Sequence, residues 1–265
     1  MNPVFAEQYG AFEAWHWWFR GRVRILSAVL RRELGVALPA RIASVGCGPL
    51  PGIGWLVPFL TPGGRVIGVD ADVRHARDAP AGCLAAAGVA EAIPLRSASC
   101  DLVVALDVIE HLDDDAAGLR ECARVLRPGG LLVVTVPALP SLWGAQDVVS
   151  RHRRRYTRAT LCEAFERAGL SPAGVTYFNS LLLPTIAAVR WARRLWPPRG
   201  PVRSDFEDTR PGIANRLLSA AFGAEAHLVG RVSLPIGVSL LATARRAARE
   251  PRSTGAAARA VASPR

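Results

Sequence analysis

Short runs of apolar residues alternate, in the first half of the chain, with segments whose apolar residues recur at helical spacing. The runs at residues 41–45, 65–69, 102–106 and 131–136 are rich in Val, Leu and Ile, and each is followed by a loop and then a helical pattern. One such helix is expected at residues 113–126, with Asp residues in its first turn and RPGG after it. Because strands that alternate with helices form βαβ units, the pattern predicts an α/β fold with a parallel sheet.

The second half of the chain is less regular, because the alternation stops after residue 136. Residues 137–157 are expected to form a long irregular insertion, and loops of that length in a compact domain are usually functional or disordered. Residues 196–211, rich in Pro, Arg and Asp, predict a mobile linker or flap. The other expected elements are helices at 160–168 and 181–196 and strands at 175–178 and 235–243.

Length and composition favour one large domain. The 265 residues are 50% apolar, which is enough for a sizeable core. The formal net charge is +11, and all 33 basic residues are Arg. Residues 245–265 hold six Arg and one Glu, a net charge of +5, in a segment rich in Ala, Ser, Pro and Gly that we expect to be disordered. Since the other arginines are not interleaved with aromatic residues, nucleic acid is not an expected partner.

The sequence also bears on the cellular compartment. The N-terminus lacks a basic segment followed by an apolar one, so a secretory signal is not expected. Apolar runs such as residues 181–189 are too short to span a bilayer. We therefore expect a soluble, cytoplasmic protein. We expect neither a disulfide framework nor a metal site, because the cysteines are scattered and form no CxxC pair. The cysteines are Cys47, Cys83, Cys100, Cys122 and Cys162.

Glycine and acidic residues occur where three of the predicted strands end. Gly46 and Gly48 follow the first strand, where glycines let a tight turn bring backbone N–H groups against a polar ligand. Asp70 ends the second strand, where a carboxylate can accept hydrogen bonds from both hydroxyls of a ribose. Leu106 and Asp107 end a third strand. Because open α/β sheets bind ligands at the carboxyl ends of their strands, we expect the binding site at this edge.

Six short motifs give the chain a resemblance to a known family. They are HWWFRGR at residues 16–22, SVGCG at 44–48, GVD at 68–70, ALDVIEH at 105–111, RVLRPGG at 124–130 and HRRRYT at 152–157. With these motifs the sequence resembles class I S-adenosylmethionine-dependent methyltransferases, in the bacterial branch related to ubiquinone-type methyltransferases. The resemblance extends over residues 9–244.

This resemblance implies a fold and a domain organisation. The fold is a Rossmann-like α/β sheet of seven strands with helices on both faces and an antiparallel seventh strand. A helical lid at residues 1–36 precedes a methyltransferase domain at 37–244, and the tail follows at 245–265. Substrate-side insertions are implied at 137–157 and 180–230.

The resemblance also implies S-adenosylmethionine as the cofactor and assigns residues to it. Gly46 and Gly48 would approach its methionine half, Asp70 its ribose, and Ala90 and Glu91 its adenine. The aromatic helix at residues 16–20 would close over the site as a lid. The implied cofactor-binding residues are Trp17, Arg20, Gly46, Cys47, Gly48, Asp70, Ala71, Ala90, Glu91, Leu106 and Asp107.

Three positions depart from the family pattern. Ser44 replaces an acid before the first glycine, Leu50 between two prolines replaces the third loop glycine, and Val89 replaces an acid near the adenine. Prolines offer no N–H group, so the loop has fewer donors, although Gly52 or Gly54 could serve as the missing glycine. At about 0.5 to 1.5 kcal/mol for each lost hydrogen bond, two or three losses would weaken cofactor binding roughly ten- to a thousandfold.

Two histidines are candidates for a catalytic base. His111 follows the strand at 102–106 on the cofactor side and has an intrinsic pKa near neutrality, and the alternative is a structural histidine held by Asp113 or Asp114. His152 lies in the insertion that would overhang the acceptor pocket.

Beside His152, the residues Arg154, Arg155 and Tyr156 could clamp a carboxylate or phosphate of the acceptor, because guanidinium groups bind such oxygens bidentately. Alternatively, this segment is a solvated basic loop, or its arginines pair with Glu163 and Glu166. The predicted catalytic residues are His111, His152, Arg155 and Tyr156.

The sequence thus predicts an S-adenosylmethionine-dependent methyltransferase that acts on a small molecule, with O-methylation the leading expectation. The apolar helix at 181–196 carries Arg and Trp, which fits a bulky, acidic or lipid-like acceptor or contact with a membrane surface, although such a stripe is also typical of a core. The three departures leave open a non-methylating reaction on the same fold, such as a cyclisation, elimination or rearrangement. The arginines leave open a non-catalytic protein that binds acidic lipid or nucleic acid.

Overall fold

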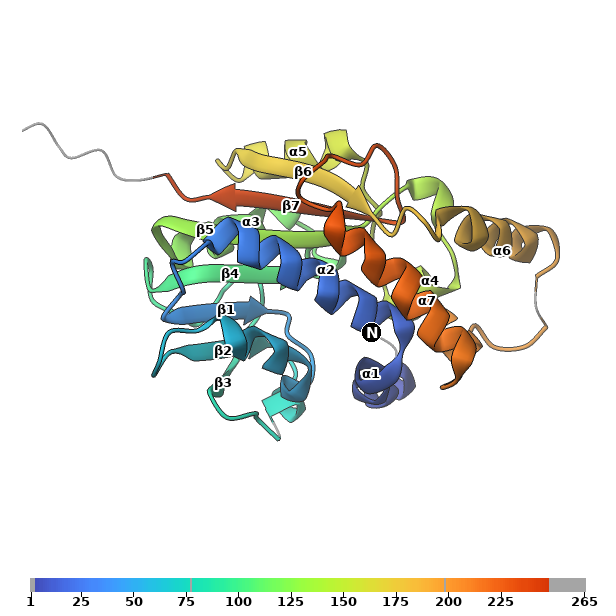
Figure 1. Ribbon diagram of the computed structural model, residues 1–265, viewed down its shortest axis with the longest axis horizontal. Helices are drawn as coiled ribbons and strands as arrows, with labels where there is room; N and C mark the ends of the chain where they lie inside the picture. The colour runs from blue at the N-terminus through green and yellow to red at the C-terminus, as the bar shows by residue number, and fades with distance from the viewer. Residues whose placement is uncertain (1–2, 77, 198, 248–265) are drawn as a thin grey trace, which may run out of the picture.

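The computed structural model describes residues 3–76, 78–197 and 199–247, and one seven-stranded sheet forms its centre (Figure 1). The strand order is β3-β2-β1-β4-β5-β7-β6. Strands β1 to β5 pair in parallel, and β7 runs antiparallel to both of its neighbours. This confirms the predicted fold class, including the reversed seventh strand. The strands are β1 (Arg41–Val45), β2 (Arg65–Asp70), β3 (Cys83–Ala87), β4 (Cys100–Leu106), β5 (Leu126–Pro137), β6 (Pro172–Phe178) and β7 (Ser239–Arg245).

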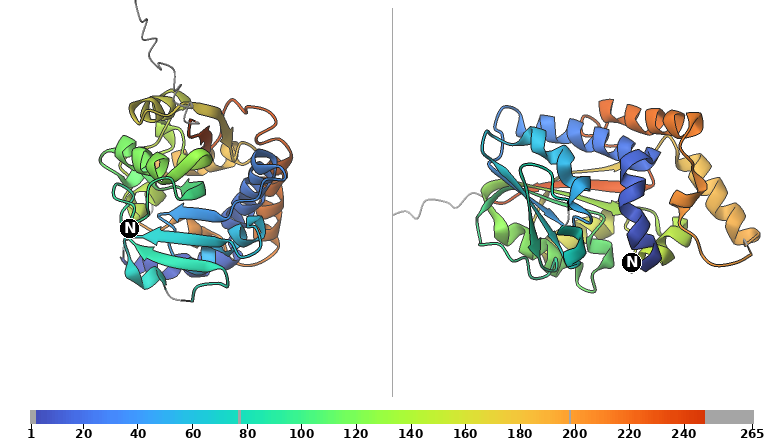
Figure 2. Two further views of the ribbon diagram at one scale, coloured as in Figure 1. Left: turned by 90° about the vertical axis from the view of Figure 1, so that its left-hand side faces the viewer. Right: turned by 90° about the horizontal axis from the view of Figure 1, so that it is seen from below.

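Helices cover both faces of the sheet (Figure 2). On one face, α3 (Asp115–Val125) and α5 (Arg158–Arg167) bury residues such as Leu119 and Phe165 against the strands. Asp114 caps α3 by accepting the N–H of Ala117 at 3.0 Å, and Thr157 caps α5. Because both faces are covered, the central strands are apolar along their whole length, which explains the continuous runs in the sequence.

On the other face, α2 (Trp17–Leu34) packs beside α7 (Ile213–Ala224). A Cβ added at Gly21 would lie 2.4 Å from the ring of Phe222, so this glycine allows the two helices to approach closely. The fully buried residues of α2 are Ile25, Leu26, Val29 and Leu30. Much of α2 therefore belongs to the core, although the predicted lid at residues 1–36 includes all of it and α1 (Pro3–Trp15).

Two further helices belong to the insertions. The segment predicted as irregular contains α4 (Ala145–Ser150), and α6 (Leu183–Leu195) follows β6 and lies beyond the end of the sheet in Figures 1 and 2. Segments of 3-10 helix also surround the sheet. They are η1 (Leu50–Phe59), η2 (Val73–Ala76), η3 (Ile109–His111), η4 (Pro140–Leu142), η5 (Asp205–Asp208) and η6 (Glu225–His227).

The structure corrects two predicted boundaries near the C-terminus. Residues 235–238 precede β7 rather than belonging to it, and Arg245 ends that strand rather than beginning a tail. The N–H of Arg246 donates to the carbonyl of Gly130 at 3.0 Å, which holds the chain to the sheet beyond this point. The rest of the predicted tail, residues 248–265, lies outside the described residues.

Two other expectations concern the whole chain. All five cysteines are free thiols. Within the part of the chain that the structure describes, no helix combines the length and the hydropathy needed to cross a bilayer.

Candidate functional site

A cavity of about 440 Å³ lies at the carboxyl ends of β1, β2 and β4. The strand order reverses between β1 and β4, and such a switch point is where open α/β sheets bind nucleotides. Every residue predicted to bind the cofactor lines this cavity except Trp17 and Arg20. The lining members of that set are Gly46, Cys47, Gly48, Asp70, Ala71, Ala90, Glu91, Leu106 and Asp107.

Two glycines shape the loop after β1. Gly46 and Gly48 both adopt left-handed backbone conformations, with φ angles of 59° and 62°. A Cβ on Gly46 would lie 2.6 Å from the side chain of Val108, so the loop also needs glycine for a close approach to the segment after β4. Position 46 therefore combines a conformational and a steric requirement.

The unusual residues of this loop leave the cavity open. Leu50 is buried in the core under the loop and does not line the cavity. Gly52 lines it, as predicted for a substitute glycine, whereas Gly54 does not. The N–H of Gly52 donates to the carbonyl of Pro49 at 3.0 Å, so it is not free for a ligand. The loop therefore provides space but few free donors.

Asp70 is held firmly at the rim of the same cavity. Its carboxylate accepts the N–H of Gly48 at 2.8 Å and the N–H of Asp72 at 2.9 Å. The Nδ1 atom of His75 lies 3.1 Å from it. These contacts connect the end of β2 to the glycine loop and orient a carboxylate at the position predicted for the ribose.

The N-terminal helices contribute three polar side chains that sequence reasoning missed. Tyr9, Glu13 and Arg22 line the cavity, and Nη1 of Arg22 lies 2.9 Å from Oδ2 of Asp107. Burial raises the pKa of Glu13 to about 7, although the positive charge of Arg22 opposes this shift. A Cβ on Gly52 would lie 2.3 Å from an oxygen of Glu13, so this carboxyl group rests against the glycine loop.

Two residues predicted to bind the cofactor, Trp17 and Arg20, do not line the cofactor cavity. The side of α2 that lines the cavity carries Phe19, Arg22 and Leu26, at the spacing of one helical face. Arg20 is on another side of the helix, is exposed and lines neither cavity described here. Trp17 lines a second, neighbouring cavity instead.

This second cavity has a volume of about 170 Å³ and adjoins the first. Tyr9, Asp107 and His111 line both. The rest of its lining comes from segments far apart in the sequence. These residues include His16, Trp17, Trp18, Gln146, Ser150, His152, Arg155, Asn179, Ile186, Arg190, Asp205 and Phe206.

The two candidate bases meet in the second cavity. The rings of His111 and His152 are edge to face, with centroids 4.8 Å apart. Burial, together with the neighbouring His152, lowers the pKa of His111 to about 4, so this ring is neutral at neutral pH. Nδ1 of His152 lies 2.9 Å from Oδ1 of Asp147. An Nδ1–H that donates to Asp147 leaves Nε2 of His152 as a proton acceptor.

Asp147 can play this orienting part because it is ionised. Burial raises its pKa, but the hydrogen bond with His152 and the charges of Arg155 and Arg190 outweigh burial and hold the pKa at about 2. Asp147 is completely buried, and its other partners fix its position. The Nε–H of Arg155 donates to it at 2.8 Å.

A carboxyl group beside the histidines adds a possible set of metal ligands. One ligand atom each from Glu110, His111 and His152 lies within 4.8 Å of the other two. Glu110 is fully buried, and neither of its carboxyl oxygens has a hydrogen-bond partner among the residues that the structure describes. Burial raises the pKa of Glu110 well above the ordinary value. A carboxylate and two imidazoles could hold a divalent cation. The expectation of no metal site rested on the spacing of the cysteines. Cysteine spacing gives no information on a set of Glu and His ligands.

Arg155 and Tyr156 have structural partners. Arg155 lines the second cavity but pairs with Asp147 and also donates to the carbonyl of Ala138 at 2.7 Å. Tyr156 is buried, lines neither cavity and donates its hydroxyl hydrogen to Asp115 at 2.9 Å. This placement corrects the expectation that Tyr156 faces the acceptor.

The alternative partners expected from the sequence are also corrected. Arg154 pairs with Asp115 at 3.3 Å, and Arg155 with Asp147, rather than with Glu163 or Glu166. Asp114 caps α3, and His111 packs against His152 rather than being held by an aspartate at 113 or 114.

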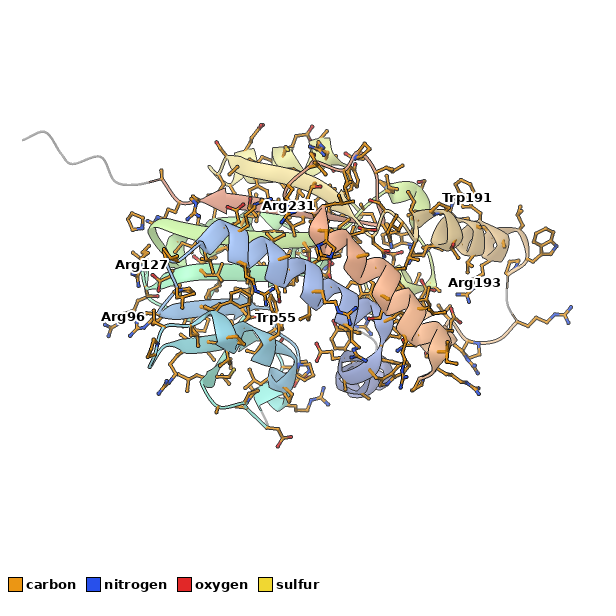
Figure 3. All side chains as sticks on the ribbon, in the orientation of Figure 1. Trp55, Arg96, Arg127, Trp191, Arg193 and Arg231 are labelled. Atoms are coloured by element: carbon orange, nitrogen blue, oxygen red, sulfur yellow. The ribbon has the colours of Figure 1, made fainter. Side chains whose placement is uncertain are left out.

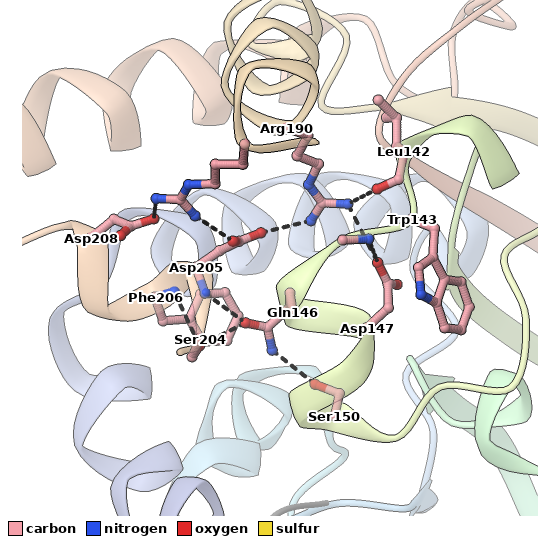
Figure 4. Close-up of polar contacts among 12 residues, drawn as sticks. Leu142, Trp143, Gln146, Asp147, Ser150, Arg190, Ser204, Asp205, Phe206 and Asp208 are labelled. Atoms are coloured by element: carbon pink, nitrogen blue, oxygen red, sulfur yellow. Dashed lines mark hydrogen bonds and ion pairs between the residues drawn. The ribbon is translucent and has the colours of Figure 1, made fainter. Parts of the chain in front are cut away.

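Ion pairs hold the outer wall of the second cavity in place (Figure 4). Arg190 of α6 lies between two carboxylates, 2.8 Å from Asp205 of η5 and 3.6 Å from Asp147 of α4. The hydroxyl of Ser204 donates to Gln146 at 2.6 Å. The segment predicted as a mobile flap is therefore joined at residues 204–205 to α4 and α6.

The fold and this site define a nucleotide-binding α/β protein with an adjoining second pocket. Residues 43–134 match the model of a family described as a methyltransferase domain. A probable S-adenosylmethionine-dependent methyltransferase of Mycolicibacterium smegmatis is 34% identical over 160 residues, which cover 58% of this chain and 59% of the relative. A ubiquinone biosynthesis O-methyltransferase of Chelativorans sp. is 28% identical over 171 residues, covering 58% of this chain and 66% of that enzyme.

A solved structure shares the fold over most of the chain. It is the chain described as a methyltransferase in the complex with the Trm112 methyltransferase activator of Haloferax volcanii, with a TM-score of 0.57 and 16% identity over 94% of this chain and 96% of that one. The matches span less than two thirds of the length of the two relatives above. Together these findings support a class I methyltransferase domain with S-adenosylmethionine as its cofactor. The particular branch of the family stays a prediction.

Proposed function

We propose that this protein is an S-adenosylmethionine-dependent methyltransferase that methylates an oxygen atom of a small molecule. The observation that carries the proposal is the junction of the two cavities at Tyr9, Asp107 and His111. The larger cavity has the strand-end position and the acid expected for a nucleoside cofactor. The smaller one contains an imidazole whose orientation is fixed by a buried carboxylate, which is the arrangement that a general base needs.

The residues of the larger cavity fit the cofactor. Asp70 presents a carboxylate for the ribose hydroxyls, and the glycine loop allows the methionine half to approach the backbone. Asp107 and Glu13 add acidic groups, which suit the positive charges of the sulfonium and the amino group. When bound, S-adenosylmethionine would supply an activated methyl group, whose carbon a nucleophile can attack in line with the bond to sulfur.

The residues of the smaller cavity fit an aromatic or otherwise bulky acceptor that carries a hydroxyl group. Trp17, Trp18 and Phe206 offer ring surfaces, while Asp147 keeps Nε2 of His152 free to take the hydroxyl proton. Removal of this proton would make the acceptor oxygen the nucleophile for the methyl group that the cofactor would supply, with the sulfur as the leaving group. The likeness to a ubiquinone biosynthesis O-methyltransferase supports oxygen as the acceptor atom.

Cofactor binding and methyl transfer are tested separately. Isothermal titration calorimetry with S-adenosylmethionine and S-adenosylhomocysteine should detect both ligands, and failure to bind either at millimolar concentration would overturn the proposal. Incubation with a panel of phenols and hydroxy acids should then give a methyl ether or ester and an equal amount of S-adenosylhomocysteine. Turnover of an acceptor without consumption of the cofactor would point instead to the non-methylating alternative.

The base is tested by substitution. His152→Asn should lower kcat by roughly a hundred- to ten-thousandfold while the affinity for the cofactor stays unchanged. His227→Asn is the matched control, because His227 is exposed and lines neither cavity. Equal kcat values for His152→Asn and the control would remove the role proposed for His152.

A further inference from the structure

The helix α6 carries large apolar residues on its solvent side. No residue of α6 is buried, and large apolar side chains on it and next to it are exposed, to 54% for Trp191, 71% for Leu195 and 75% for Trp196. A surface helix normally buries its apolar stripe and exposes its charges. Here the reverse holds, so the exposed stripe calls for a partner outside the fold.

Two of the three arginines of α6 face the protein body instead. Arg190 and Arg193 pair with Asp205 at 2.8 and 3.1 Å, and Arg193 also pairs with Asp208 at 2.7 Å (Figure 4). Residues two positions apart on a helix point about 200° apart, so Trp191 and Arg193 lie on nearly opposite sides. Figure 3 shows them on opposite edges of α6. The ion pairs therefore hold the helix with its apolar side turned outward.

Further large apolar residues are exposed on segments that follow α6. Val202 and, at the start of α7, Ile213 and Leu217 are also exposed. Figures 1 and 2 place α6 and α7 at the same end of the molecule. We call this region the α6 surface. It consists of Leu181, Trp191, Leu195, Trp196, Val202, Ile213 and Leu217.

Positive charge accompanies the α6 surface. Residues 181–217 contain seven Arg against three acidic residues, a net charge of +4. Besides Arg194 of α6, four of these arginines are exposed, between or beside the apolar residues. They are Arg199, Arg203, Arg210 and Arg216.

We propose that the α6 surface docks the protein on an anionic lipid bilayer. Exposed Trp and Leu side chains insert at the boundary between headgroups and acyl chains, and nearby arginines attract anionic headgroups. A second copy of this chain fits less well, because it would bring two surfaces of net charge +4 together. A protein partner would have to supply both an apolar groove and acidic groups. An anionic bilayer offers acyl chains and anionic headgroups everywhere along its surface.

The test uses the full chain and sedimentation with vesicles of phosphatidylcholine, with and without phosphatidylglycerol. We expect binding to the vesicles that contain phosphatidylglycerol, weakened by salt. The double variant Trp191→Ser, Trp196→Ser should reduce the bound fraction at least tenfold, and so should the double variant Arg199→Glu, Arg203→Glu. Circular dichroism checks that each variant is folded.

Matched controls come from exposed residues outside the α6 surface. Val36 is 100% exposed, and Arg96 lies toward the opposite end of the molecule in Figure 3. Val36→Ser and Arg96→Glu should leave vesicle binding unchanged. The proposal is overturned if the Trp double variant sediments like the wild type, or if vesicles without phosphatidylglycerol bind equally well. It is also overturned if light scattering shows a dimer that the Trp double variant dissociates.

Discussion

Glu13 should make the affinity for S-adenosylmethionine depend on pH. Its carboxyl group lines the cofactor cavity against Gly52, and burial raises its pKa to about 7. A cationic ligand favours the ionised carboxylate, so binding should lower this pKa toward the ordinary value of 4.5. Protonated Glu13 must then lose its proton when S-adenosylmethionine binds, and the affinity should rise as the pH rises through 7.

The size of the effect follows from the fraction of Glu13 that is ionised. With a pKa of about 7 in the free protein, roughly nine tenths of the carboxyl groups are ionised near pH 8 and one tenth near pH 6. The affinity should therefore be about tenfold lower near pH 6 than near pH 8, which corresponds to about 1.4 kcal/mol. His111, with a pKa of about 4, stays neutral over this range.

Calorimetry at constant ionic strength near pH 6, 7 and 8 measures this dependence. S-adenosylhomocysteine has the same amino-acid part but lacks the sulfonium charge, so its affinity should change less. Glu13→Gln should flatten the curve for S-adenosylmethionine. A change of less than twofold for the wild type, or an equally steep curve for Glu13→Gln, would refute this reasoning.

Three other substitutions test the site and the fold. Gly46→Ala should destabilise the protein by about 1 to 3 kcal/mol and weaken cofactor binding, because φ is positive and Val108 is too close. Adding Val108→Ala should restore only part of the melting temperature, and full restoration would show that backbone strain is unimportant. Burial lowers the pKa of His16 to about 4, so stability should fall by up to about 3 kcal/mol as the pH decreases from about 6.5 toward 4. His16→Asn, which keeps an acceptor for the N–H of Trp18, should fall less in thermal melts, and an unchanged pH profile would contradict this. Asp70→Ala should weaken S-adenosylmethionine roughly ten- to a hundredfold in calorimetry, and an unchanged affinity would exclude the ribose contact.

The sequence predicted the central strands well because their physical situation is simple. The strands β1, β2 and β4 are rich in Val, Leu and Ile and have a glycine or an acid at or directly after their last residue, so the strand ends can be located. The edge strand β3 was missed, because it reads CLAAA and three of its five residues are exposed. Its alanines carry little β-propensity and no apolar alternation.

Side-chain direction was harder to predict than position along the chain. Arg20 and Arg22 are two residues apart on α2, yet only Arg22 reaches the cofactor cavity, because about 200° of helical rotation separates them. Tyr156 lies in the predicted loop but turns into the core toward Asp115. Leu26 is fully buried and lies four positions after Arg22, on the same face of α2. The apolar face of this helix could therefore have indicated that Arg22, rather than Arg20, points inward.

The acceptor side could not be predicted because it depends on contacts between distant segments. Asp147, Arg190 and Asp205 come from three separate elements and meet only in the folded chain. Their local sequences carry no shared motif. The network around His152 therefore became visible only in three dimensions.

The two cavities are lined mostly by different segments of the chain, which has an evolutionary consequence. Most of the cofactor cavity comes from residues 44–112, within or next to the matched family region, whereas much of the second cavity comes from residues 137–239 and from the first helices. Substitutions and insertions in the later segments can thus diversify the molecules accepted without altering the nucleoside pocket. Under the proposed function, descendants of such a gene can acquire new acceptors while inheriting the same methyl donor.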